Sequence, residues 1–258
     1  MESNLQRIVG DHITVEVDLD RGGRISSIKW KDLEFALPYR ENPMNWGWFA
    51  MVPWAGRIDK GVIKNAEGVE FNLPTHWDPP HAEHGFGFVS IWVSTSPNSS
   101  RLDMPAPYAP AYAEQTIELL DDTMTWTLNY FANGCTLPAW VGFHPWRPRR
   151  INDINECTLI FEAEKMLRRG DDGLPNGDLV DVSPQPWDDA FFGVTNSPIV
   201  QWGNTAQLAI TASVPWWVIY DEDPLAICVE PQTAPPDAAN LNISGAHSVS
   251  ATFTFSNE

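Results

Sequence analysis

The chain has 258 residues, 43% of them hydrophobic, which is enough to bury a sizeable core as one large domain or two small ones. Its 16 basic and 34 acidic residues give a formal net charge of -18, which argues against nucleic acid and anionic membranes as partners. Three scattered cysteines make no disulfide framework, the first residues lack a secretory signal, and no window is apolar enough to span a bilayer. We therefore expect a cytoplasmic protein with reduced thiols.

Runs of alternating apolar and polar residues, separated by turn-forming residues, follow one another along the chain. A period of two predicts half-buried β-strands. We expect strands over residues 13–19, 25–30, 33–37, 88–93, 112–120, 124–131, 158–163, 207–212, 216–220, 226–230 and 249–255, and a core strand ending near residue 52. Helical periodicity is weak and 22 prolines are spread along the chain, so the expected fold is all-β, a large antiparallel β-sandwich forming one domain over residues 1–258.

The run Gly-Phe-His-Pro-Trp at residues 142–146 places a histidine, the side chain that most readily exchanges protons near neutral pH, after an apolar segment. We expect His144 at the end of a strand. Trp140, Phe143 and Trp146 would then supply an aromatic wall of the kind on which sugar rings stack. A histidine beside aromatic residues is more often an ordinary hydrogen-bonded side chain, so a functional interpretation needs partners from elsewhere in the chain.

Three distant segments supply such partners. His84 precedes Gly85, whose backbone freedom indicates a tight turn that presents the imidazole. Glu230 stands before Pro231 at a predicted strand boundary. Arg57 follows an aromatic-rich segment, where it either faces water or donates planar hydrogen bonds to hydroxyls or a carboxylate in a cleft.

No metal site is expected. His81 and His84 have a ligand-like spacing, but Pro79 and Pro80 forbid a regular helix there, and the sequence offers no third ligand nearby. The aspartates and glycines of residues 169–177 lack the glutamate of a calcium loop, which indicates a plain connection.

Five fragments in this order resemble the aldose 1-epimerase (galactose mutarotase) family. They are Trp54-Ala55-Gly56-Arg57-Ile58, His84-Gly85-Phe86, Gly142-Phe143-His144-Pro145-Trp146, Trp187-Asp188-Asp189-Ala190-Phe191 and Val229-Glu230-Pro231-Gln232-Thr233. Each fragment alone is weak, but the five together are fairly specific. Gly22-Gly23-Arg24-Ile25 and the strand expected over residues 249–255 also resemble the family's ends, so the resemblance covers nearly the whole chain. The resemblance implies a galactose mutarotase-like supersandwich and an enzyme that interconverts the α and β anomers of a sugar.

The resemblance also implies roles for individual residues. His144 would be the general acid and Glu230 the general base, with His84 as a third catalytic residue. Arg57 would help His84 to hold the ring oxygen and hydroxyls, and Trp54 and Trp146 would contact the sugar. Asp188, or its neighbour Asp189, would bind hydroxyls. No cofactor or metal is implied.

The chemistry suits these residue types. Opening the sugar ring requires a base that removes the proton of the anomeric hydroxyl and an acid that protonates the ring oxygen. The ordinary pKa of a glutamate, about 4.3, predicts an ionised Glu230 at pH 7. His144, with an ordinary pKa near 6.5, would need a nearby carboxylate to stay protonated.

Three alternatives remain open at this point. A non-catalytic carbohydrate-binding sandwich would use the same aromatic residues, and a glycosidase or lyase would use the carboxylates. A hexose 6-phosphate epimerase would need a cationic pocket, for which Arg147, Arg149 and Arg150 are candidates. We expect a neutral free aldohexose instead, because these arginines are predicted to lie in an exposed loop. The sequence gives neither the particular sugar nor the oligomeric state.

Overall fold

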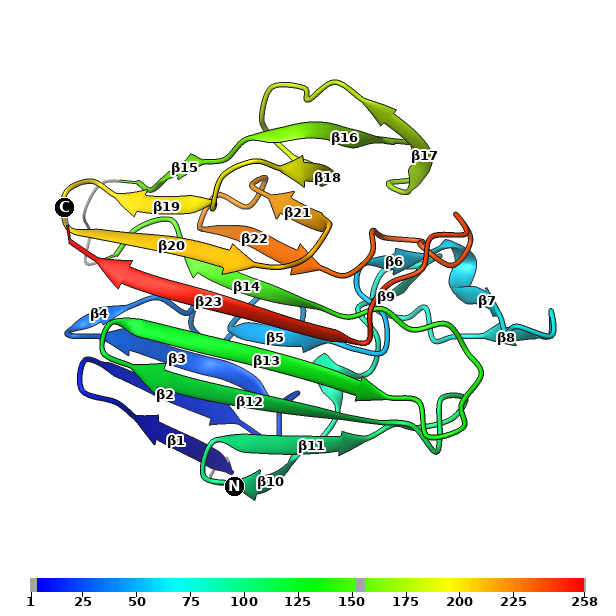
Figure 1. The fold of residues 1–258 in the computed structure, drawn as a ribbon, viewed down its shortest axis with the longest axis horizontal. Helices are drawn as coiled ribbons and strands as arrows, with labels where there is room; N and C mark the ends of the chain where they lie inside the picture. Colours follow the sequence, from blue (N-terminus) through cyan, green and yellow to red (C-terminus); the bar gives the residue numbers. More distant parts are fainter. Residues whose placement is uncertain (1–3, 152–155, 258) are drawn as a thin grey trace.

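The computed structural model describes residues 4–151 and 156–257, and in these ranges two large antiparallel sheets lie face to face (Figure 1). The eleven-stranded sheet runs in the order β1 (Leu5–Val9), β2 (Ile13–Asp18), β3 (Arg24–Trp30), β5 (Trp48–Met51), β14 (Gly142–Pro148), β22 (Ala226–Gln232), β21 (Trp216–Tyr220), β18 (Asp188–Val194), β16 (Ala163–Arg169) and β17 (Pro175–Val180), with β4 (Leu33–Glu34) paired to β3.

The second sheet has eight strands, and smaller elements complete the fold. Its order is β10 (Val93–Ser96), β11 (Ser99–Asp103), β12 (Tyr112–Leu120), β13 (Thr123–Phe131), β23 (Ser248–Ser256), β20 (Ala206–Ala212), β19 (Ile199–Trp202) and β15 (Thr158–Ile160). The small elements are the pairs β6 (Arg57–Ile58) with β9 (Ala82–Glu83) and β7 (Val62–Lys64) with β8 (Glu70–Asn72), and the 3₁₀ turns η1 (Asp59–Gly61) and η2 (Gly87–Val89).

The two sheets are joined by aromatic packing between β14 and the eight-stranded sheet. Phe143 stacks on Trp126 of β13 with ring centroids 3.9 Å apart, and the Arg147 guanidinium lies 5.8 Å from the ring centroid of Phe253 in β23. Phe143 and Arg147 therefore point into the sandwich. Because side chains alternate along a strand, His144 between them points to the outer face of the eleven-stranded sheet.

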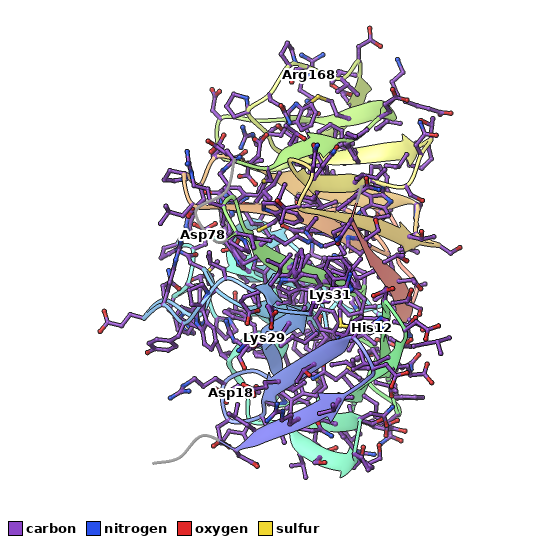
Figure 2. The ribbon with its side chains drawn as sticks, turned by 90° about the vertical axis from the view of Figure 1, so that its left-hand side faces the viewer. His12, Asp18, Lys29, Lys31, Asp78 and Arg168 are labelled. Carbon is purple, nitrogen blue, oxygen red and sulfur yellow. The ribbon has the colours of Figure 1, made fainter. Side chains whose placement is uncertain are left out.

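Loops and short strands cover part of this outer face, so it is not a solvated surface. Figure 2 turns the molecule by 90°, and Asp78 lies there on the side away from the eight-stranded sheet. This covering layer includes β6, β9 and η2, and it leaves His84 and His144 each only 6% exposed. The covered part of the outer face can therefore hold a water-poor site.

The predicted all-β antiparallel sandwich is confirmed. The longest strongly alternating runs are predicted best: residues 112–120 and 124–131 form the β12–β13 hairpin, and residues 249–255 lie in β23. In the described parts of the chain, no helix has the length and apolarity that crossing a bilayer requires.

Three local predictions are wrong. Residues 88–92 form a 3₁₀ turn and a connection, and only Val93 belongs to a strand, because the Trp92 indole donates a hydrogen bond to the Gly87 carbonyl (2.9 Å) and folds the segment back. The strand predicted over 33–37 ends at Glu34, whose carboxylate accepts hydrogen bonds from the Ile28 (2.7 Å) and Ala36 (3.0 Å) amides.

The third error concerns the strand around His144. Residues 136–141 are not a strand, and β14 begins at Gly142, so His144 lies early inside a central strand rather than at the end of one. The Trp140 indole donates to the Ala55 carbonyl (2.7 Å), and the Val141 amide donates to the Thr233 hydroxyl (2.9 Å). These bonds hold the preceding segment across the end of the sheet.

The turn that carries His84 depends on Gly85. Gly85 has φ +73°, and a Cβ there would lie 2.1 Å from the Val52 carbonyl oxygen. Gly68, by contrast, has φ +79° with open space around it.

We predict that Gly85→Ala destabilises the fold more than Gly68→Ala. Both changes place an alanine in the left-handed region, at roughly 1–2 kcal/mol. Only Gly85→Ala adds a backbone collision, worth roughly a further 1–3 kcal/mol. Denaturant unfolding of both variants measures the difference, and equal losses would show that the close approach to Val52 is unimportant.

Candidate active site

A cavity of about 970 Å³, counting its open mouth, opens on the outer face of the eleven-stranded sheet. The central strands β14, β22, β21 and β18 form its floor, and the covering loops form its walls. Six of the seven site residues predicted from the sequence line it, namely Arg57, His84, His144, Trp146, Asp188 and Glu230.

Strand register explains which side chains meet on the floor. Directly paired residues of neighbouring strands point to the same face. One row runs from Trp146 through Cys228 and Tyr220 to Asp188. A second row, two residues along, contains Glu230, which pairs with Val218 of β21.

His144 falls in the second row, opposite Glu230. The pairs Gly142–Gln232 and Trp146–Cys228 flank it and have the same register. The ladder is interrupted between these pairs, where Pro145 and Pro231 lack the N–H group needed for backbone pairing. The interruption leaves side-chain contacts to join the two strands here.

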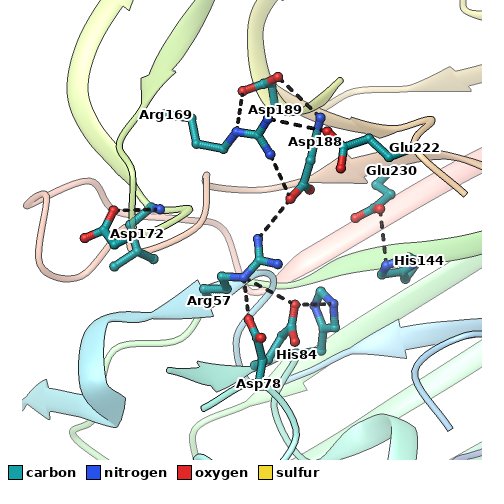
Figure 3. A network of polar contacts seen from close by, with 12 residues as sticks. Arg57, Asp78, His84, His144, Arg169, Asp172, Asp188, Asp189, Glu222 and Glu230 are labelled. Carbon is teal, nitrogen blue, oxygen red and sulfur yellow. Dashed lines mark hydrogen bonds and ion pairs between the residues drawn. The ribbon is translucent and has the colours of Figure 1, made fainter. Parts of the chain in front are cut away.

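The His144 imidazole and the Glu230 carboxyl are in direct contact. The distance from His144 Nε2 to Glu230 Oε1 is 3.3 Å, and Figure 3 shows the pair. His144 is stacked between the rings of Phe49 (centroids 4.8 Å apart) and Trp146 (5.1 Å), and the Gln232 amide donates to Glu230 Oε2 at 3.0 Å. Packing and hydrogen bonding thus fix both groups.

Burial pushes both members of this pair toward their neutral forms. It lowers the pKa of His144 to about 3, assisted by the positive charges of Arg24, Arg57 and Arg147. Burial also raises the pKa of Glu230 well above its usual range, assisted by the Asp188 carboxylate. The pair therefore holds one proton, and burial favours that proton on Glu230.

The expectation of an ionised Glu230 and a protonated His144 is wrong for this structure. It started from the ordinary pKa values of the two side chains, which apply to groups in water. Glu230 is only 2% exposed and His144 6%, so dehydration dominates.

His84 contacts the His144–Glu230 pair from the covering loops on the other side of the cavity. Its ring makes an edge-on contact with His144, with centroids 4.9 Å apart, and its Nε2 lies 3.3 Å from Glu83 Oε1. Burial, with the neighbouring His144 and Arg57, lowers the pKa of His84 well below its usual value. His84 is thus a neutral hydrogen-bonding group.

Arg57 lies in a ring of carboxylates rather than among tryptophans (Figure 3). Its Nε is 2.6 Å from Asp78 Oδ2 and 3.7 Å from Glu83 Oε1, and its Nη1 is 3.4 Å from Asp188 Oδ2. Burial alone would lower the pKa of Arg57, but the charges of Glu83, Asp188 and Asp78 together raise it. Arg57 is therefore a permanent cation in the cavity wall, where it can donate hydrogen bonds to a ligand.

A second arginine, which the sequence analysis did not identify, completes the upper part of this network. Arg169 Nη1 lies 3.1 Å from Asp188 Oδ2, and its Nε is 3.4 Å from Asp189 Oδ1. Asp188 therefore bridges Arg57 and Arg169, whereas Asp189 contacts Arg169 (Figure 3). Both aspartates line the cavity, but Asp188 is the one linked to the His84 wall through Arg57.

Some of the predicted aromatic wall lies elsewhere. Trp54 is 1% exposed and packs on Phe86 and Tyr108, and the structure does not place it among the cavity-lining residues. Trp140 is buried and Phe143 faces the sandwich interior, so Trp146 alone of the predicted three lines the cavity.

Other lining residues were missed because nothing in the local sequence distinguishes them. Glu83 directly precedes His84 but has no sequence feature of its own, and Trp77 and Arg169 lie next to turn-forming residues in segments that usually face water. The missed lining residues with polar or aromatic side chains include Asn42, Asn45, Trp77, Asp78, Glu83, Arg169, Tyr220 and Gln232.

The arginines considered for a phosphate pocket do not line the cavity. Arg147 is not in an exposed loop: it is 0% exposed in β14, its guanidinium lies 4.6 Å from the Trp48 ring centroid, and burial lowers its pKa to about 9. Arg149 donates to the backbone carbonyls of Asp221 and Asp223. Arg150 is exposed and lies 3.7 Å from Glu156.

The His81–His84 pair is not a metal-type cluster in the described residues. His81 Nδ1 lies 3.5 Å from Asp59 Oδ1, whereas His84 contacts Glu83, and no third ligand joins the two histidines.

Comparison with known proteins identifies the family. The sequence model of the aldose 1-epimerase family matches residues 10–249, which is most of the chain. The fold and the cavity define a mutarotase-like β-sandwich, and the chain belongs to the aldose 1-epimerase family. A search of curated proteins returned no match.

Solved structures show the same fold at low sequence identity. A putative aldose 1-epimerase from Escherichia coli K12 is 20% identical, with a TM-score of 0.83 and 99% of both chains covered. A galactose mutarotase-like protein from Clostridium acetobutylicum is 15% identical, with a TM-score of 0.79, and covers 98% of this chain and 95% of its own. An aldose epimerase homologue from C. elegans is 16% identical, with a TM-score of 0.76 and 99% of both chains covered.

Glu83 gives the site a testable pH signature. Burial raises its pKa from the ordinary 4.5 to about 7, against the opposing charge of Arg57. The folded protein therefore retains a proton that the unfolded chain releases near pH 4.5.

We predict that this contribution to stability is fully present below about pH 4.5 and is lost as pH rises through about 7. Glu83→Gln cannot titrate, so the wild-type stability relative to this variant should fall by roughly 3 kcal/mol across that window. Urea unfolding of both proteins at several pH values measures the change. A difference that is constant or rises with pH would contradict the assignment.

Proposed function

We propose that the protein is an aldose 1-epimerase that interconverts the α and β anomers of a free, unphosphorylated aldose. The observation that carries this proposal is the contact of 3.3 Å between His144 Nε2 and Glu230 Oε1 on the floor of the cavity. Anomer exchange needs one group that gives a proton and one that takes a proton a few ångströms away. Two buried groups that share a single proton meet this requirement.

The reaction opens and closes the ring by moving two protons. Glu230 takes the proton of the O1 hydroxyl while His144 gives one to the ring oxygen O5, and the C1–O5 bond breaks to leave an aldehyde. After rotation about C1–C2, protonated Glu230 returns its proton to O1, His144 takes the proton of the O5 hydroxyl, and C1–O5 forms again. The pair ends the cycle with the one proton with which it began.

The favoured neutral pair is the state that begins the second half of this cycle, because neutral His144 and protonated Glu230 are the forms that close the ring. Ring opening starts from the other arrangement, which arises when the proton moves from Glu230 to His144 across the 3.3 Å contact. Sugar hydroxyls that donate hydrogen bonds to the carboxylate would favour that arrangement. By lowering the free-energy difference between the two arrangements, the bound sugar would let the reaction run both ways.

The remaining cavity groups suit a polyhydroxylated ligand. Arg57 donates hydrogen bonds, Asp188 and Asp78 accept them, and Trp146 and Trp77 offer apolar surface. Direct contact of two histidines and a glutamate from three distant segments favours this proposal over a carbohydrate-binding module without catalysis.

The charge of the cavity supports a neutral substrate over a phosphorylated one. Five carboxyl groups and two guanidinium groups line its described part: Asp78, Glu83, Asp188, Asp189, Glu230, Arg57 and Arg169. Both arginines are already paired with carboxylates. Even with Glu230 protonated and Glu83 partly so, the carboxylates of Asp78, Asp188 and Asp189 outnumber the two guanidinium groups. A dianionic phosphate would therefore meet a net negative charge.

Replacing either member of the pair should remove catalysis while leaving the fold intact. We predict that Glu230→Gln and His144→Asn each lower the rate of anomer exchange by about a hundredfold to ten-thousandfold. Exchange NMR on an equilibrated aldose measures the rate, with Glu118→Gln, at an exposed position of β12 in the other sheet, as a matched control. Near-normal exchange in a folded Glu230→Gln protein would refute the role of Glu230.

The substrate preference has a separate test. We predict that kcat/KM for glucose or galactose exceeds that for glucose 6-phosphate by at least about tenfold. Added salt should reduce this ratio, because it screens the repulsion between the phosphate and the cavity carboxylates. Polarimetry on freshly dissolved sugars provides the comparison. Preference for the phosphate would establish a phosphosugar enzyme instead.

Acid and base catalysis by the pair uses no metal ion in any step. Prolonged treatment with a strong chelator should therefore not lower the rate, as polarimetry before and after treatment will show. A loss that a divalent ion restores would contradict the proposed mechanism.

A further inference from the structure

A third side chain with strong affinity for metals lies beside the pair. His144, Cys228 and Glu230 each offer one ligand atom, and the three atoms lie within 4.8 Å of one another. All three residues are buried, with exposed fractions of 6%, 0% and 2%. The proposed reaction does not use Cys228.

The strand register accounts for this cluster. Cys228 and Glu230 are two residues apart on β22, so both point to the outer face of the sheet. Cys228 pairs with Trp146 on one side and Tyr220 on the other, and these two rings lie 5.5 Å apart. The thiol therefore lies behind the cavity surface, close to His144 and Glu230, which do line the cavity.

The ligand types and spacings fit a zinc-like ion. Imidazole nitrogen, thiolate sulfur and carboxylate oxygen bind Zn²⁺ at about 2.0–2.3 Å, which puts two ligands of a tetrahedral ion roughly 3.3–3.8 Å apart. The His144–Glu230 distance of 3.3 Å is already in this range, and the largest separation in the cluster, 4.8 Å, requires a closure of roughly 1 Å. Three protein ligands would leave the fourth position open toward the cavity.

We propose that Zn²⁺ binds reversibly to His144, Cys228 and Glu230 and blocks the catalytic pair. Binding forms bonds from the metal to nitrogen, sulfur and oxygen, and releases to solvent the proton of the Cys228 thiol and the one proton shared by the pair. The lone pairs of His144 and Glu230 that would accept protons from the sugar are then bound to the metal. Mg²⁺, which prefers an all-oxygen octahedral shell, does not fit this site.

Metal binding is tested without reference to activity. Co²⁺ serves as a spectroscopic probe, because cobalt bound to a thiolate shows a charge-transfer absorption, and Zn²⁺ is measured by competition. Wild type should bind one equivalent, and Cys228→Ala should lose the thiolate absorption and at least about tenfold in affinity. Cys157→Ala, which removes another buried thiol, should bind like wild type.

Two results would overturn the site: no binding to wild type, or unchanged binding and absorption in Cys228→Ala. Cys228→Ser keeps nearly the same volume and provides a second variant if the alanine variant does not fold. A serine variant that keeps the full affinity would also contradict the sulfur ligand.

Inhibition by Zn²⁺ rests on the proposed function, and it is measured separately, as the rate of anomer exchange. Saturating Zn²⁺ should lower anomer exchange by wild type and Cys157→Ala at least about tenfold, competitively with the sugar, whereas Mg²⁺ should not. Cys228→Ala, relative to its own metal-free rate, should need at least about ten times more Zn²⁺. If the protein binds the metal through Cys228 but shows no anomer exchange, the metal site is supported and the proposed function is refuted. If anomer exchange continues unchanged with Zn²⁺ bound, the inhibition is refuted.

Discussion

The register between β14 and β22 is the constraint on which the rest of the site depends. It places His144 opposite Glu230 on the outer face of the sheet, with Phe143 and Arg147 facing the sandwich interior. A shift of one residue would turn the imidazole into the core and Arg147 into the cavity. The stacking of Phe143 on Trp126 across the two sheets opposes that shift, so the hydrophobic core maintains the geometry of the His144–Glu230 pair.

Burial then determines what this geometry can do. In water, a histidine and a glutamate at 3.3 Å would form an ordinary ion pair. Beneath the covering loops the charged forms of both lose hydration, while Arg57, Arg24 and Arg147 add positive potential near His144. The result is a pair with one mobile proton rather than two fixed charges, and the proposed ring opening and closure use the transfer of that proton. The surrounding ion-pair network fixes Arg57 and Asp188 without neutralising the cavity's acidic surplus.

The sequence predicted the fold class from local patterns, and its five family-like fragments include the two segments that supply the buried His144–Glu230 pair. Residues 112–131 alternate cleanly and form the expected hairpin, and the Gly-Phe-His and Glu-Pro-Gln runs both occur in central strands. It could not predict that Trp54 packs away from the cavity or that Arg147 is buried between the sheets, since both outcomes depend on tertiary packing between segments far apart in the chain. The roles of Glu83 and Arg169 were missed for the same reason: they depend on tertiary ion pairs.

The most direct test of a single shared proton is the protonation state of His144 itself. Side-chain ¹⁵N NMR, with the signals assigned by their absence from His144→Asn, distinguishes a neutral imidazole from an imidazolium. The account predicts a neutral His144 ring in the free protein at pH 7 that stays neutral well below pH 6, because burial lowers its pKa to about 3. An imidazolium at pH 7, or a titration at the ordinary value near 6.5, would contradict it.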